Sequence, residues 1–195
     1  MKHSRDIVVV FCFLVLSGCS ASAQGNIPLP DASSRPTPLH FGLYVTPDPA
    51  QNPIDPPERF MGFHVGEDFE ILPGEEDAEI PVTALCDGEI VTSAWVEGYG
   101  GLVRQHCVID DQKVTVLYGH LALDSLIPAG QTASGGQRIG VLGAARSHDT
   151  DGNRKHLHLG ILKGWGNESL GYVQTKDEID AFVDPATVLP SFSRP

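Results

Sequence analysis

From Phe60 onward the sequence is a succession of short apolar runs, each bounded by Gly or Asp. The runs are rich in Val, Ile and Thr, so they predict strands joined by turns. One segment, Glu178–Val183, has a helical pattern of about two turns at most. We therefore expect an all-β domain of mainly antiparallel sheets, packed as a hybrid of a sandwich and a barrel, with a short C-terminal helix. The predicted strands are IPVTAL (80–85), EIVTSAW (89–95), LVRQHCVI (102–109), KVTVLYGHL (113–121), RIGVLG (138–143) and HLHLGIL (156–162).

Residues 1–18 carry the pattern of a secretory signal peptide. Lys2 and Arg5 precede an uninterrupted apolar run, Ile7–Leu16, and small residues follow it. The sequence Leu16-Ser17-Gly18-Cys19 resembles a bacterial lipobox, in which the cysteine is diacylated and becomes the mature N-terminus. We expect an exported lipoprotein, anchored to a membrane through Cys19 and facing the periplasm or the cell surface. Cleavage after the rival site, Ala21-Ser22-Ala23, would instead release a soluble secreted protein.

The remaining chain divides into a linker and one domain. Residues 24–38 hold four prolines together with Ser, Gly and Asn and show no apolar period, which is typical of a linker. We therefore predict a Pro/Ser-rich linker over residues 19–39 and a single β domain over residues 40–195.

The charge balance excludes some partners. Lys and Arg number 13 against 25 Asp and Glu, which gives a formal charge of −12. This excess of negative charge repels phosphate backbones and anionic headgroups, so we expect no nucleic-acid partner and no polybasic membrane patch.

Two of the four cysteines, Cys86 and Cys107, belong to the predicted domain. In an oxidising compartment they are a candidate disulfide, with two buried free thiols as the alternative. They flank a predicted hairpin whose turn is Glu97–Gly101. A symmetric turn would place Cys107 opposite Ile90, so the bond requires a bend or bulge near Asp87-Gly88.

Three motifs carry the histidines of chemical interest. His156-Leu157-His158 lies in a strand-like run, where residues two apart point to the same face, so both imidazoles face one spot. The run from His64 to Asp68 offers an imidazole and a carboxylate around Gly66, and His120 ends the longest predicted strand. A strand-borne His pair, a His/Asp pair and a further His suit a zinc site with an open position for water.

Together and in this order, the motifs resemble those of the lysostaphin/LytM-type zinc metallopeptidases, which cut peptide cross-links of bacterial cell walls. That family shows HxxxD, a Y-x-H-L-like strand end, G-Q-x-I-G and a final HLH. This chain has HVGED (64–68), YGHL (118–121), GQRIG (136–140) and KHLHLG (155–160). It departs from the family in the loop before HLH, where Asp151–Lys155 replaces a Ser/Thr-Gly-Pro run. His40, His106 and His148 match no position of the family.

The resemblance implies a division of labour among five residues. His64, Asp68 and His158 would bind zinc, and His120 and His156 would form the unliganded catalytic pair. Zinc with such ligands acidifies bound water and polarises a scissile carbonyl. One free histidine would take a proton from water, while the other would stabilise the oxyanion or protonate the leaving amine. Either could be the base.

The function implied is therefore that of a monomeric zinc metalloendopeptidase acting on peptidoglycan peptides. The sequence does not determine which peptide bond is cut. One alternative is a non-catalytic family member that binds the cell wall or regulates other wall hydrolases, usually after losing ligands. The presence of all five site residues argues against it. Another alternative, a histidine that carries a phosphoryl group in a sugar-uptake protein, requires a cytosolic partner, and the signal peptide disfavours that location.

Overall fold

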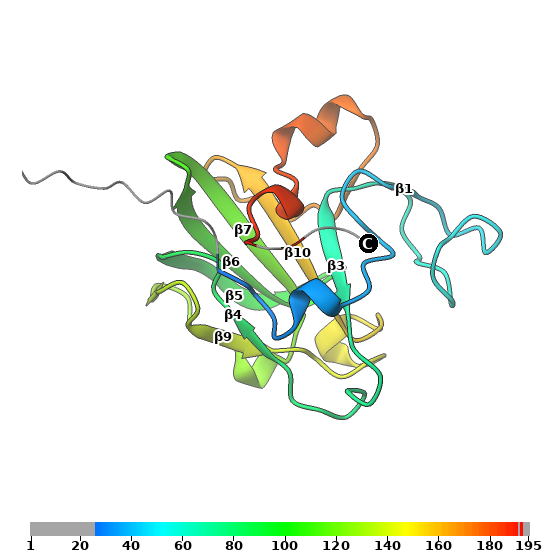
Figure 1. Cartoon of the computed structure of the whole chain (residues 1–195), viewed down its shortest axis with the longest axis horizontal. Helices are drawn as coiled ribbons and strands as arrows, with labels where there is room; N and C mark the ends of the chain where they lie inside the picture. Colours follow the sequence, from blue (N-terminus) through cyan, green and yellow to red (C-terminus); the bar gives the residue numbers. More distant parts are fainter. Residues whose placement is uncertain (1–25, 191, 193–195) are drawn as a thin grey trace, which may run out of the picture.

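A six-stranded sheet forms the centre of the domain in the computed structural model, which describes residues 26–190 and 192 (Figure 1). Its strands follow the order β3-β10-β7-β6-β5-β8, and all neighbours are antiparallel. The predicted all-β architecture of antiparallel sheets is confirmed. The six strands are β3 (Gly66–Glu70), β5 (Gly88–Val96), β6 (Gly100–Ile109), β7 (Gln112–Leu121), β8 (Thr132–Ala133) and β10 (His156–Lys163).

Two smaller sheets complete the architecture. One has the order β1-β2-β11, with β1 (Tyr44–Val45), β2 (Gly62–His64) and β11 (Tyr172–Val173), and the other pairs β4 (Pro81–Thr83) with β9 (Arg138–Val141). Five short 3₁₀ helices lie within the described residues: η1 (Ala32–Ser34), η2 (Leu123–Ser125), η3 (His148–Thr150), η4 (Asp177–Ala181) and η5 (Pro185–Thr187).

The helix predicted over Glu178–Val183 is the 3₁₀ helix η4, which ends at Ala181. Phe182 is extended, with φ −113° and ψ 164°, and forms a bridge with Leu162 on β10. The Phe182 side chain is only 5% exposed. Burying this aromatic ring against the sheet therefore ends the helix two residues earlier than its local pattern indicates.

The two faces of β10 differ in chemistry. Leu157, Leu159 and Ile161 are fully buried in the main apolar core, which also includes residues of β5, β6 and β7. Because successive side chains of a strand point to opposite faces, His156 and His158 face away from this core. One face of the sheet thus supplies packing, and the other presents imidazoles.

Cys86 and Cys107 form the predicted disulfide, with a Cα–Cα distance of 6.1 Å. Cys107 pairs with Gly88 rather than with Ile90. One irregularity that permits this register lies between Ile90 and Thr92, not at Asp87-Gly88 as expected. This bulge adds one residue to β5 and shifts the partners from Ile90 to Gly88 by one position. The turn contributes the other position, because Val96 pairs with Gly100 there.

Part of the segment expected to be a linker packs on the domain. The packing begins at Asn26, whose backbone N–H donates to the carbonyl of Leu85 at 2.6 Å. Leu29 and Leu39, further along the segment, are at most 1% exposed. The backbone N–H groups of Asp68 and Glu70 donate to the carbonyls of Leu39 and Pro36, both at 3.0 Å. This N-terminal segment therefore covers the outer edge of β3 (Figure 1).

The predicted signal peptide, Cys19 and the rival cleavage site at Ala21-Ser22-Ala23 lie outside the described residues. Between residues 26 and 190, and at 192, no helix has the length and apolar character needed to cross a membrane.

Candidate functional site

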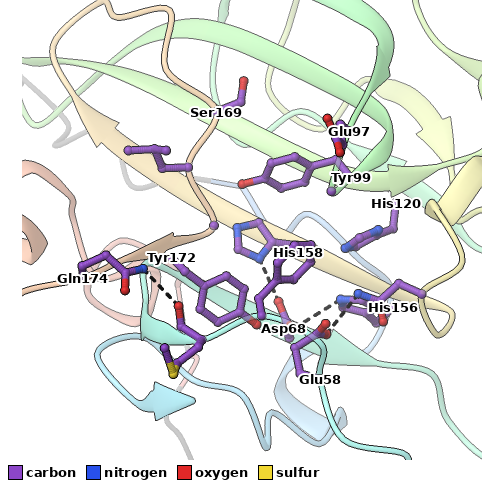
Figure 2. A pocket seen from close by; sticks show the side chains of 16 residues that line it. Glu58, Asp68, Glu97, Tyr99, His120, His156, His158, Ser169, Tyr172 and Gln174 are labelled. Carbon is purple, nitrogen blue, oxygen red and sulfur yellow. Dashed lines mark hydrogen bonds and ion pairs between the residues drawn. The ribbon is translucent and has the colours of Figure 1, made fainter. Parts of the chain in front are cut away.

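Three buried side chains, His64, Asp68 and His158, converge where β2, β3 and β10 meet. Figure 2 shows Asp68 and His158 side by side in the cavity wall. His158 lies directly opposite Asp68 in the β3–β10 pair, and His64 ends β2. Nδ1 of His158 lies 2.9 Å from Oδ1 of Asp68 and 3.0 Å from Nε2 of His64. The third separation, from His64 Nε2 to Asp68 Oδ1, is 3.3 Å. Two imidazole nitrogens and one carboxylate oxygen in this arrangement are a donor set suited to zinc.

His64 and Asp68 lie four residues apart and face the same site although they are not in a helix. This is possible because the chain passes from one sheet to another between them. His64 belongs to the three-stranded sheet and Gly66 to the six-stranded sheet, with buried Val65 at the junction. Gly66 also leaves room for an imidazole. A Cβ at Gly66 would lie 2.6 Å from Nε2 of His158, so any side chain there would displace the ring.

The orientation of His64 is set by the N-terminal segment. Its Nδ1 lies 3.3 Å from the carbonyl oxygen of His40, which can only accept a hydrogen bond. Nδ1 therefore carries the proton, and the lone pair of Nε2 points toward Asp68 and His158. Sequence reasoning missed this contact because a backbone carbonyl leaves no mark in the residue pattern.

His120 and His156 form a second pair beside the three potential ligands. Their ring centroids are 4.3 Å apart, and Nε2 of His156 lies 3.3 Å from Oδ2 of Asp68. His120 is the penultimate residue of β7 and has φ +65°, and its buried Nδ1 has no hydrogen-bond partner among the described residues. Burial, aided by the neighbouring His156, lowers the pKa of His120 well below its usual value. A neutral imidazole with an unused nitrogen can accept a proton.

All five side chains predicted for the site thus lie together. His106 and His148 lie elsewhere, where their rings stack on Trp165 and Trp95.

A largely buried arginine that the sequence reasoning did not select joins the site. Nη2 of Arg154 donates to Oδ2 of Asp68 at 2.6 Å. Burial by itself raises the pKa of Asp68, but His64, His156 and Arg154 together lower it well below its usual value. Asp68 is therefore an ionised carboxylate. The departure from the family pattern at Asp151–Lys155 was the available signal for Arg154.

The site opens into a cavity of about 270 Å³. Tyr99 and Tyr172 line it (Figure 2), and the buried hydroxyl of Tyr99 has no hydrogen-bond partner in the part of the chain that the structure describes. Met61 and Leu170 are 52% and 48% exposed at its wall, which gives the cavity an apolar side for a ligand.

Comparisons with known proteins place this geometry in context. The sequence profile of peptidase family M23 matches residues 62–171, which is more than half of the chain. None of the curated protein sequences matches.

Among solved structures, the catalytic domain of the antimicrobial peptidase lysostaphin from Staphylococcus simulans has a TM-score of 0.50 and 21% identity. The match covers 78% of this chain and 90% of that domain. A longer lysostaphin structure from the same organism has a TM-score of 0.52 and 19% identity, covering 85% of this chain and 52% of the other. These likenesses show a shared fold, and this chain spans about half of the longer protein.

Proposed function

Because the chain belongs to peptidase family M23, we propose that it is a zinc-dependent endopeptidase that hydrolyses peptide cross-links of bacterial peptidoglycan as a monomer. The observation that supports this most is the buried convergence of His64, Asp68 and His158, which would hold the ion through Nε2, Oδ1 and Nδ1. Two neutral nitrogens and one carboxylate leave a fourth position open.

Bound zinc supplies positive charge that acidifies a water and polarises the scissile carbonyl. His120 and His156 lie beside the ligands without belonging to the proposed set. One of them takes the proton of the attacking water, and the other stabilises the oxyanion or protonates the leaving amine. The buried position of the five side chains limits water around them, which strengthens these interactions.

The direct test is incubation of the purified protein with defined peptidoglycan peptides, read by mass spectrometry. We expect cleavage of an internal peptide bond that stops when a chelator removes the metal and returns when zinc is added. The variant His158→Ala is the matched inactive control. A wild type that binds zinc in a one-to-one ratio but cleaves none of the peptides would instead be a non-catalytic binder or regulator.

We also propose that the protein is exported and anchored through a lipid on Cys19, because peptidoglycan lies outside the cytoplasmic membrane. Cys19→Ser should abolish incorporation of labelled fatty acid and shift the protein from the membrane to the soluble fraction. A wild type that never takes up the label, and whose mature chain begins after Ala23, contradicts the anchor.

A further inference from the structure

The two carboxylate oxygens of Asp68 face different partners. Oδ1 lies 2.9 Å from Nδ1 of His158 and 3.3 Å from Nε2 of His64, so it points to the centre of the proposed ligand set. Oδ2 accepts a hydrogen bond from Nη2 of Arg154 at 2.6 Å. A charge-assisted bond of this length is among the strongest that a carboxylate makes.

Arg154 is held by two further carboxylates. Its Nε donates to Oε1 of Glu70 at 2.8 Å, and its Nη1 donates to Oε2 of Glu58 at 3.2 Å. Glu58 is 4% exposed, lines the cavity, and also accepts from Nδ2 of Asn153 at 3.0 Å. The planar guanidinium is thereby fixed from three directions. A lysine ammonium, being a single point of charge, could not replace this geometry.

The charges of Arg154 and its three carboxylate partners also favour a fixed position of the guanidinium. Although burial alone lowers the pKa of Arg154, the nearby carboxylates of Asp68 and Glu70 raise it above its usual value. The side chain is only 15% exposed, so water contributes little to its solvation. One permanent cation is therefore shared by three carboxylates.

We propose that Arg154 is a positioning residue that restricts Asp68 to coordination through Oδ1 alone. The inference rests on the proposed zinc site. A carboxylate that binds through both oxygens occupies two positions around an ion. By holding Oδ2, Arg154 prevents this and keeps the remaining position for water. The same side chain ties the ligand Asp68 to Glu58 in the cavity wall.

The test compares zinc-loaded crystal structures and zinc dissociation constants of the wild type and R154Q, the latter by competition with a chromophoric chelator. In the wild type we expect one Asp68 oxygen within about 2.2 Å of the ion. In R154Q we expect both oxygens near the ion, and a dissociation constant raised by about 10–100-fold. Coordination through one oxygen in R154Q overturns the proposal, as does coordination through both oxygens in the wild type.

Two further variants serve as a control and as a second test. R138Q removes another Arg–carboxylate pair, the exposed contact of Arg138 with Glu79, and should leave zinc affinity and coordination unchanged. R154Q/E70Q removes one positive and one negative charge together, so it preserves the charge balance and gives the same readout if R154Q does not fold. None of these measurements uses a substrate. A wild type that binds zinc but cleaves no peptide therefore contradicts the proposed function and leaves this test valid.

Discussion

The sheet carries two buried polar clusters whose hydrogen bonding differs. The Gln105 cluster consists of Gln105, Tyr118 and the backbone of Leu85 and Cys86. Nε2 of Gln105 donates to the Cys86 carbonyl at 2.7 Å, and Oε1 of Gln105 accepts from the Tyr118 hydroxyl at 2.9 Å. That hydroxyl in turn accepts from the Leu85 N–H at 2.8 Å. Each polar side-chain atom of Gln105 and Tyr118 therefore has a partner.

The Asp68 cluster, which consists of His64, Asp68, His120, His156 and His158, is different. Within residues 26–190 and 192, Nδ1 of His120 and Nε2 of His158 are buried without a partner, and so is the hydroxyl of neighbouring Tyr99. An unpaired buried polar atom costs about 1–3 kcal/mol. The comparison teaches that a fully paired cluster stabilises the sheet, whereas an incompletely paired cluster retains groups for a ligand.

The largest expected effect is a loss of turnover at the Asp68 cluster that leaves the proposed zinc bound. His120→Ala should keep near one-to-one zinc but lower turnover by about 10²–10⁴, the usual contribution of general acid–base catalysis. His158→Ala should lose both zinc and turnover. Elemental analysis beside the peptide assay checks both variants. If His120→Ala loses zinc as fully as His158→Ala does, His120 is a ligand.

The next effect concerns the disulfide beside the Gln105 cluster. Reducing the Cys86–Cys107 bond should lower the free energy of unfolding by about 2–4 kcal/mol, because the unfolded chain loses a constraint across 21 residues of separation. Zinc content should not change, since neither cysteine contacts the five side chains of the Asp68 cluster. Denaturant titration with and without reductant provides the measurement, and equal midpoints would contradict a stabilising bond.

Removing a single hydroxyl group tests the Gln105 cluster itself. Tyr118→Phe removes the hydroxyl and leaves the Leu85 N–H and Gln105 Oε1 unpaired in the core. We expect the free energy of unfolding to fall by about 1–3 kcal/mol, with zinc affinity unchanged. A zinc affinity that falls as much as stability would mean that the two clusters are coupled.

The smallest effect is a pH dependence of the metal-free protein. Burial lowers the pKa of both His120 and His158, whereas the same imidazoles in the unfolded chain titrate near pH 6.5. Below about pH 6.5 the unfolded state therefore binds protons that the folded state does not. As the pH decreases below this value, the free energy of unfolding should decrease by at most about 1.4 kcal/mol per pH unit for each proton.

Chemical denaturation between pH 5 and 8 measures this slope. His120→Asn should make it shallower, and Tyr118→Phe should leave it unchanged. A slope that is the same in all three proteins would assign the effect to other groups.

Local patterns were sufficient for β4, β5, β6, β7, β9 and β10 and for the five side chains predicted for the site. The predicted runs did not include the shorter strands β1, β2, β3, β8 and β11. Alternation and turn residues marked the strands, and the HxH spacing placed His156 and His158 on one face of β10. The motifs also selected residues that the fold brings together, although their individual roles stay predictions. Contacts between segments distant in sequence could not be predicted from local patterns. Arg154 meets Glu58 across 96 positions, and the bulge in β5 depends on pairing with β6.

The hydrogen bond that holds Asn26 on the domain limits how far the domain could extend from a membrane. If Cys19 is the anchor, six residues lie between it and Asn26. Fully extended, this stretch spans at most about 25 Å. A free linker to residue 40 would have allowed about three times that reach. A cell-wall enzyme on such a short tether could cut only the cross-links nearest to the membrane surface.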